Sequence, residues 1–162
     1  MARHSSQHPR GYHLIWPTYG TWLPGDERGW VQRGDPERRP PQRGLAAWSA
    51  AQLRWPPLRF DREQRAVVAA AFDDACARRG WTLRARAVQT AHVHVVVEAD
   101  ADASDVRGAL KRAATRALRR RWPSLEGREL WAGSGWTCTL GAFVDVDRSI
   151  DYAEHDHHRP RR

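Results

Sequence analysis

The chain has 162 residues with 41% hydrophobic and 28% charged side chains, which favours one globular domain spanning residues 1–162. No apolar run approaches the roughly 20 residues that cross a bilayer, and the first ten residues lack the apolar stretch of a secretory signal. Neither of the two cysteines lies in a CxxC motif. A reduced, cytoplasmic protein without a membrane partner is therefore expected. The formal net charge of +8 favours a polyanionic partner, of which nucleic acid is the commonest in a cell.

The first half of the chain predicts a strand, a long connection and a helix. Residues 11–21 alternate apolar and polar side chains, as in a half-buried strand. Residues 24–58 are rich in proline, glycine and arginine and are expected to form an irregular connection. A helix is expected over 62–79, because Asp61 and Gln64 have the spacing of a capping box and a glycine follows the last residue.

The second half predicts a hairpin, a helix, a strand and a final helix. Alternation favours strands at 81–89 and 92–98, joined by a short turn. A second helix is expected over 104–122, capped by the serine at its start and stopped by a proline. Residues 130–140 predict a fourth strand, and residues 147–156 a short helix that begins with an aspartate cap.

Without its last helix, this order is βαββαβ. That order is typical of the ferredoxin-like α+β fold, in which helices cover one face of an antiparallel sheet. The extra C-terminal helix is expected to be followed by a frayed tail at 157–162.

The triplet His92-Val93-His94 is the sharpest chemical signal. Alternate residues of a strand point to the same face, so His92 and His94 lie side by side with Cβ atoms roughly 6–7 Å apart. Two imidazoles at that spacing are able to bind one metal ion, although a short HxH motif is more often only a strand with histidines on its wetter face. The strand is apolar enough to be central in the sheet. Polar side chains on a central strand need a binding partner or a function, which favours a functional role for both histidines.

The final helix pairs Tyr152 with Asp156. Positions i and i+4 of a helix share a face, with Cβ atoms about 5–6 Å apart. This spacing suits Asp156 as a metal ligand beside a nucleophilic Tyr152, but taken alone it fits better a tyrosine that packs its ring on the sheet. His155 stays open as an alternative ligand to Asp156.

The helix expected over 104–122 is basic. An arginine face beside a metal site would follow the phosphates of a nucleic acid, but charge runs are also the ordinary solvated face of a helix. A GC-rich genome also produces many arginines, so the charge alone does not establish DNA binding. The candidate DNA-binding residues are Arg112, Arg116, Arg119 and Arg120.

Three stretches together resemble the HUH single-tyrosine transposases, and within them the REP-associated tyrosine transposases. Residues 18–26 (TYGTWLPGD) resemble the stretch after the first strand of that family. Residues 85–97 resemble the strand pair that carries its histidine motif, and residues 150–154 (IDYAE) the helix that carries its tyrosine. The chain departs from the family at residues 89–91 (QTA), where Met-Pro-Asp is common, and at Asp156, where Asn or Gln is frequent.

The resemblance implies a metal-dependent DNA endonuclease and strand transferase. Tyr152 would be its nucleophile, and single-stranded or hairpin DNA would be cut and rejoined through a 5′-phosphotyrosine. His92, His94 and Asp156 would bind Mg²⁺ or Mn²⁺, and the two imidazoles favour Mn²⁺. The resemblance also implies a cytoplasmic, nucleoid-associated protein acting as a homodimer or as a monomer.

Other functions stay open at this point. The main alternative is a catalytically inactive or domesticated protein that binds single-stranded nucleic acid with its tryptophans and arginines. RNA-recognition folds share the expected layout, but no aromatic-rich motif lies on the central strands. A phosphoesterase with two HxT/S motifs would need a second such motif, and residues 13–15 (HLI) lack the Thr or Ser. Replication initiators and relaxases share the chemistry but usually occur in larger chains.

Overall fold

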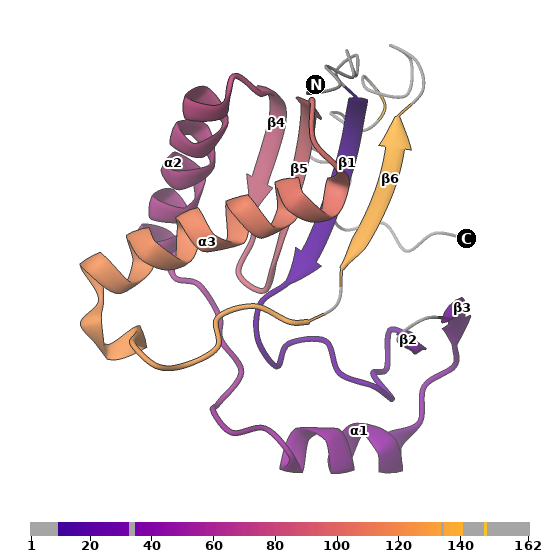
Figure 1. Ribbon diagram of the computed structural model, residues 1–162. Coiled ribbons are helices and arrows are strands. Elements are labelled where there is room, and N and C mark those ends of the chain that lie inside the picture. The colour runs from indigo at the N-terminus through magenta and orange to yellow at the C-terminus, as the bar shows by residue number, and fades with distance from the viewer. Residues whose placement is uncertain (1–9, 33–34, 134, 141–147, 149–162) are drawn as a thin grey trace, which may run out of the picture.

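The computed structural model describes residues 10–32, 35–133, 135–140 and 148. Four strands form one antiparallel sheet, in the spatial order β4-β5-β1-β6 (Figure 1). They are β1 (Arg10–Pro17), β4 (Thr82–Val88), β5 (His92–Ala99) and β6 (Trp136–Leu140). Two long helices, α2 (Arg62–Arg79) and α3 (Ala103–Arg121), pack against each other and lie over one face of this sheet.

The sequence of these six elements confirms the ferredoxin-like prediction. Along the chain they follow one another as β1, α2, β4, β5, α3 and β6, and the two central strands of the sheet are β5 and β1. The additional helix predicted over 147–156 lies outside the described residues, apart from Arg148. No helix in the described part of the chain is long and apolar enough to span a bilayer.

The ends of α2 are fixed by local chemistry, as predicted. The Asp61 carboxylate accepts a hydrogen bond from the Gln64 backbone NH at 2.8 Å, and the Gln64 side-chain oxygen accepts one from the Asp61 backbone NH at 3.1 Å. These bonds satisfy two NH groups that the first turn of a helix leaves unpaired. Gly80 ends the helix in the left-handed conformation, with φ of +69°.

The start of α3 differs from the prediction. The helix is capped at Asp102 instead of Ser104, and no side chain there makes a capping hydrogen bond. It ends at Arg121, where Trp122 leaves helical geometry and Pro123 begins the short 3-10 helix η1 (Pro123–Leu125). Proline disfavours helical geometry in the residue before it, which explains the stop.

The prediction of an irregular connection over 24–58 is wrong. This segment contains the strands β2 (Trp30–Gln32) and β3 (Asp35–Arg39), which pair with each other, and the helix α1 (Arg43–Ala51). Figure 1 shows it beyond the end of the main sheet at which β1 ends. Gly25, with φ of +89°, permits the close approach of its loop to α1, because a Cβ there would lie 2.4 Å from the Ala46 nitrogen. No local sequence pattern predicts this contact between Gly25 and Ala46, which are 21 residues apart in the chain.

The first and last strands of the main sheet are also shorter than predicted. β1 ends at Pro17 and β6 begins only at Trp136. Thr18 leaves the ladder, making a single bridge to Trp131, and its NH donates to the Ala91 carbonyl at 2.8 Å.

The core lies between the sheet and the two helices. Leu14 and Trp16 of β1 are fully buried there, and the Trp16 ring packs edge-on against Phe72 of α2 with centroids 5.7 Å apart. The apolar stripes of both helices face the sheet, as their 3.6-residue periodicity predicts. Other fully buried members are Val68, Val93, Val95, Val97, Val106, Leu110, Ala114 and Leu118.

Candidate active site

Two histidines of β5 lie on the face of the sheet opposite α2 and α3. Successive side chains of a strand point to opposite faces, and Val93, Val95 and Val97 are buried in the core beneath the helices. His92 and His94 therefore share the other face, as predicted, with ring centroids 5.0 Å apart and ring planes at 72°. The triplet brings two imidazoles together on a central strand.

A third histidine, His13 of β1, joins this pair. β1 and β5 are antiparallel neighbours in which Ile15 stands opposite His94, so His13 is the diagonal neighbour of His94. His13 Nε2 and His94 Nδ1 are hydrogen-bonded at 3.3 Å, and the two residues are only 4% and 3% exposed. One of these nitrogens must donate and the other accept, so the bond links the tautomers of the two rings.

Sequence reasoning missed the role of His13. Alternation in residues 11–21 already places His13 on the face opposite Tyr12, Leu14 and Trp16. The missing information is the register of β1 against β5, two strands that are far apart in the sequence. Within its own strand, His13 lacks the Thr or Ser two residues later that an HxT/S motif requires, so the sequence alone gives it no role.

Two side chains of β6 border the histidines. Cys138 stands opposite His13 in the β1–β6 register, and Trp136 stands opposite Ile15. The Trp136 indole contacts the His13 ring edge-on at 5.6 Å between centroids and is 45% exposed. An exposed indole is the kind of surface on which unpaired bases stack. This face therefore combines imidazoles with an accessible aromatic ring.

The turn before His92 is held by two buried threonines from the stretch 18–26. The Thr18 hydroxyl donates to the Leu58 carbonyl at 2.6 Å. The Thr21 hydroxyl lies 3.0 Å from the Ala91 carbonyl, which also accepts the Thr18 NH. Because Ala91 directly precedes His92, these bonds fix the start of β5 against the end of β1. The stretch thus helps to position the first histidine.

The nearby carboxylates have other partners. Glu98 of β5 accepts two hydrogen bonds from Arg84, at 3.0 and 3.1 Å. Asp26 is bound by the side chain and the backbone NH of Arg28. Burial opposes ionisation of Asp26, but the hydrogen bonds from Arg28 outweigh it and lower the pKa of Asp26. Both carboxylates are engaged in ion pairs outside the histidine cluster.

The predicted nucleophile and third metal ligand lie outside the described residues. Tyr152, Asp156 and the alternative ligand His155 therefore stay predictions. Among the described residues, no group of three or more His, Cys, Asp or Glu side chains has the arrangement to hold a metal ion. The site needs a further donor from elsewhere if it binds a metal.

The donor chemistry of His92 and His94 fits a divalent metal ion. Neutral imidazole is the commonest protein ligand of transition metals. A ligating histidine is normally oriented by a hydrogen bond at its other ring nitrogen. The bond between His94 Nδ1 and His13 is of this kind, and it would direct Nε2 of His94 to the metal.

The predicted DNA-binding arginines lie on α3, on the other side of the sheet from the histidines. The expectation of an arginine face beside the metal site is therefore wrong in its geometry, because the apolar stripe of α3 packs on the face formed by Val93, Val95 and Val97. Arg112, Arg116 and Arg120 are exposed. Arg119 is partly buried and donates to the Arg128 carbonyl at 3.0 Å. A role of these arginines in DNA binding stays a prediction.

The sequence matches one family profile, described as "Transposase IS200 like", over residues 58–154. Among solved structures, the fold is similar to a REP-associated tyrosine transposase bound to a REP hairpin, with a TM-score of 0.53, 13% identity and coverage of 94% of this chain and 70% of that chain. It is also similar to a candidate transposase from Deinococcus radiodurans R1, with a TM-score of 0.49, 20% identity and coverage of 97% and 98%. Among curated proteins, none matches the sequence.

Proposed function

The chain belongs to the family of IS200-like transposases, and from this premise we propose that it cuts and rejoins single-stranded or hairpin DNA through a tyrosine and a divalent metal ion. The observation that carries the proposal is the pairing of His92 and His94 on the face of β5 opposite α2 and α3, where His94 is hydrogen-bonded to His13. The similar fold of a transposase bound to a REP hairpin supports hairpin DNA as the substrate class.

Tyr152 is the proposed nucleophile. A free tyrosine has a pKa near 10, so its phenolate costs about 4 kcal/mol at pH 7, and the site must lower this cost. The phenol loses its proton and its oxygen bonds to the phosphorus, while the 3′-oxygen of the DNA leaves and gains a proton. The resulting 5′-phosphotyrosine keeps the energy of the diester bond, so a 3′-OH is able to reverse the step without ATP.

His92, His94 and Asp156 are the residues proposed to hold Mg²⁺ or Mn²⁺. Their oxygen and nitrogen donors suit either ion, and the imidazoles favour Mn²⁺. When bound, the ion supplies a positive charge that stabilises the charge developing on the phosphate, worth several kcal/mol. His13 orients His94, and the hydrogen bonds from Thr18 and Thr21 to the Ala91 carbonyl position His92.

The proposed partner is single-stranded or hairpin DNA in the cytoplasm, at the nucleoid. The net charge of +8 and the exposed indole of Trp136 beside His13 support this partner. The protein would act as a monomer or as a homodimer.

The proposal is tested by replacing the histidines. We expect His92→Ala and His94→Ala each to reduce Mn²⁺-dependent cleavage of a hairpin DNA pool about 100-fold or more, because the metal charge is worth several kcal/mol. His4→Ala, in the polar N-terminal segment, is the matched histidine control. Both site variants should keep the wild-type affinity for the same DNA in EDTA.

Two outcomes would argue against this assignment. Full cleavage by both variants would remove the histidines from the reaction. If the wild-type protein binds the pool but never cuts it, the alternative of an inactive single-stranded nucleic-acid-binding protein gains support.

A further inference from the structure

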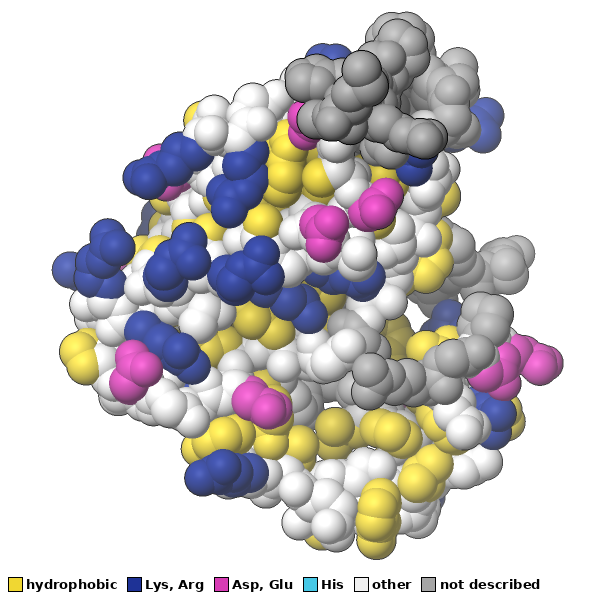
Figure 2. Space-filling model, viewed as in Figure 1, with side chains coloured by type: hydrophobic (Ala, Val, Ile, Leu, Met, Phe, Trp, Pro, Cys, Tyr) yellow, Lys and Arg dark blue, Asp and Glu magenta, His cyan; other side chains and the backbone are white. Residues whose placement is uncertain are grey.

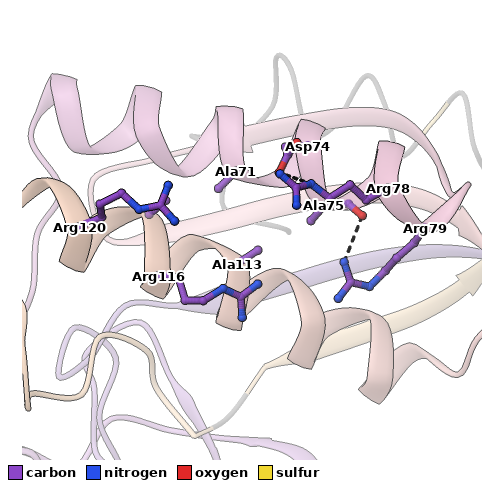
Figure 3. Close-up of a pocket in the computed structure, with 9 residues that line it drawn as sticks. Ala71, Asp74, Ala75, Arg78, Arg79, Ala113, Arg116 and Arg120 are labelled. Carbon is purple, nitrogen blue, oxygen red and sulfur yellow. Dashed lines mark hydrogen bonds and ion pairs between the residues drawn. The ribbon is translucent and has the colours of Figure 1, made fainter.

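A groove on the outer surface of the helix layer collects arginines from two helices. It lies between α2 and α3, has a volume of about 160 Å³ and is lined by four arginines, four alanines and one aspartate. Figure 3 shows Arg78 and Arg79 on the α2 side and Arg116 and Arg120 on the α3 side. In Figure 2 dark-blue side chains form rows over the same two helices. We call these nine residues the arginine groove.

The arginine groove is strongly positive. Its one acidic residue, Asp74, is paired with Arg78 at 2.9 Å, one helical turn away. Arg79 donates to the Ala75 carbonyl at 3.3 Å, a neutral partner. In the described part of the chain, neither Arg116 nor Arg120 makes an ion pair, although both are exposed. The groove therefore has an excess of positive charge that no described side chain neutralises.

The shape of the arginine groove suits phosphates better than bases. Besides the arginines and Asp74, its lining consists of alanines, whose side chains are small. None of the nine lining residues is aromatic, so the groove itself offers no ring on which an unpaired base could stack. Guanidinium groups bind phosphate oxygens with two parallel hydrogen bonds. Arg116 and Arg120 lie one turn apart, about 6 Å along α3.

The arginine groove faces away from the histidines. The core residues of α3, such as Leu110, pack on the sheet face formed by Val95, and His94 lies on the opposite face. A DNA segment that reaches His92 and His94 is therefore separated from the groove by the full thickness of the sheet and the helix layer. Phosphates in the groove must belong to a different part of the DNA.

We propose that the arginine groove binds the phosphate backbone of the duplex stem of a DNA hairpin, while the histidine face receives its single-stranded part. This inference rests on the proposed function for the kind of DNA, but the binding itself requires no cleavage. Duplex DNA carries about one charge per 1.7 Å of helix axis and so attracts a cationic groove without aromatic residues. The contacts are to the backbone, so the groove does not read the stem sequence.

The test compares binding to two fluorescent DNAs in EDTA, where no metal-dependent cleavage occurs. One is a hairpin with a stem of roughly ten base pairs, about one helical turn, and the other is a single strand of the same loop sequence. Arg116→Gln/Arg120→Gln should weaken hairpin binding about tenfold or more and reduce the salt dependence of log K by about 2, because two phosphate contacts are lost. Binding of the single strand should change less than about twofold.

Three further variants sharpen the test. Arg43→Gln/Arg62→Gln removes the same charge from two exposed arginines whose side chains make no hydrogen bond or ion pair with the described residues. It should leave hairpin affinity close to wild type. Arg78→Gln, on the opposite wall of the groove, should weaken hairpin binding as well. Asp74→Asn should strengthen it, because the groove loses its one negative charge.

Each outcome decides the proposal. Equal losses in the groove and control variants would show a general effect of net charge and overturn it. Equal losses for hairpin and single strand would also overturn it, because the groove would then not select the duplex. If the wild-type chain fails to cut DNA with Mn²⁺ present but shows the expected stem binding, the proposed function fails and the arginine groove stands.

Discussion

The His13 and His94 rings are hydrogen-bonded although their positions are 81 residues apart in the sequence. This contact exists because β1 and β5 are adjacent central strands with a register that makes the two residues diagonal neighbours. The neighbouring His92 and His94 were predictable, since alternation in a single strand places them on one face. His13 was not, because strand register depends on tertiary contacts that the sequence of one strand does not contain.

At this scale we expect His13→Ala to reduce the affinity for Mn²⁺ by about 10- to 100-fold, the usual effect of losing the partner of a ligating histidine. His13→Gln should restore part of the affinity, because its amide oxygen is able to take the place of Nε2 and accept the hydrogen bond from His94 Nδ1. Calorimetric titration measures both, with thermal melting as a check on the fold. Unchanged Mn²⁺ affinity in His13→Ala would show that this residue only fills space.

Among the elements, α2 was the most predictable and the 24–58 segment the least. The bounds of α2 follow from residues that are neighbours in the chain, namely the capping box at Asp61 and the glycine at position 80. The pairing of β2 with β3 and the packing of α1 against Gly25 depend on contacts between distant residues. The proline and glycine content of this segment therefore gave a misleading signal for an irregular connection.

The contact of α3 with the segment before β6 predicts a pH effect. Lys111 of α3 donates to the Ala132 carbonyl at 2.9 Å, and burial, aided by the nearby charge of Arg107, lowers the pKa of Lys111 to about 8. In the unfolded chain this lysine keeps its proton up to about pH 10.5. Between these values the unfolded state binds more protons, so the free energy of unfolding rises with pH.

We therefore expect wild type to gain about 1 kcal/mol of stability relative to Lys111→Met when the pH rises from 8 to 9. Urea denaturation of both proteins measures this difference, and taking the difference cancels the effects of all other titrating groups. A stability difference that is constant from pH 7 to 9 would contradict the lowered pKa.

At the scale of the whole molecule, the sheet separates two surfaces of different chemistry. One carries three histidines and an exposed indole, and the other carries the arginine groove on α2 and α3. The sequence predicted His92, His94 and the ferredoxin-like order of elements, and it named Arg116 and Arg120 as DNA-binding residues. It missed His13, Arg78 and Arg79, and it placed the arginines beside the histidines. The reason is that periodicity predicts which residues of an element share a face, and it does not tell on which side of the sheet the element packs.

The central claim is that Tyr152 forms a covalent bond with DNA, and covalent capture tests it most directly. Wild-type protein is incubated with Mn²⁺ and a hairpin DNA pool labelled at the 3′ end, then run on a denaturing gel. We expect a labelled protein band that disappears with EDTA or with Tyr152→Phe and remains in Tyr12→Phe, whose hydroxyl donates to the Ala101 carbonyl in the fold. The same pool labelled at the 5′ end should give no labelled protein, because a 5′-phosphotyrosine retains only the downstream DNA. A labelled band that persists in Tyr152→Phe would contradict the account.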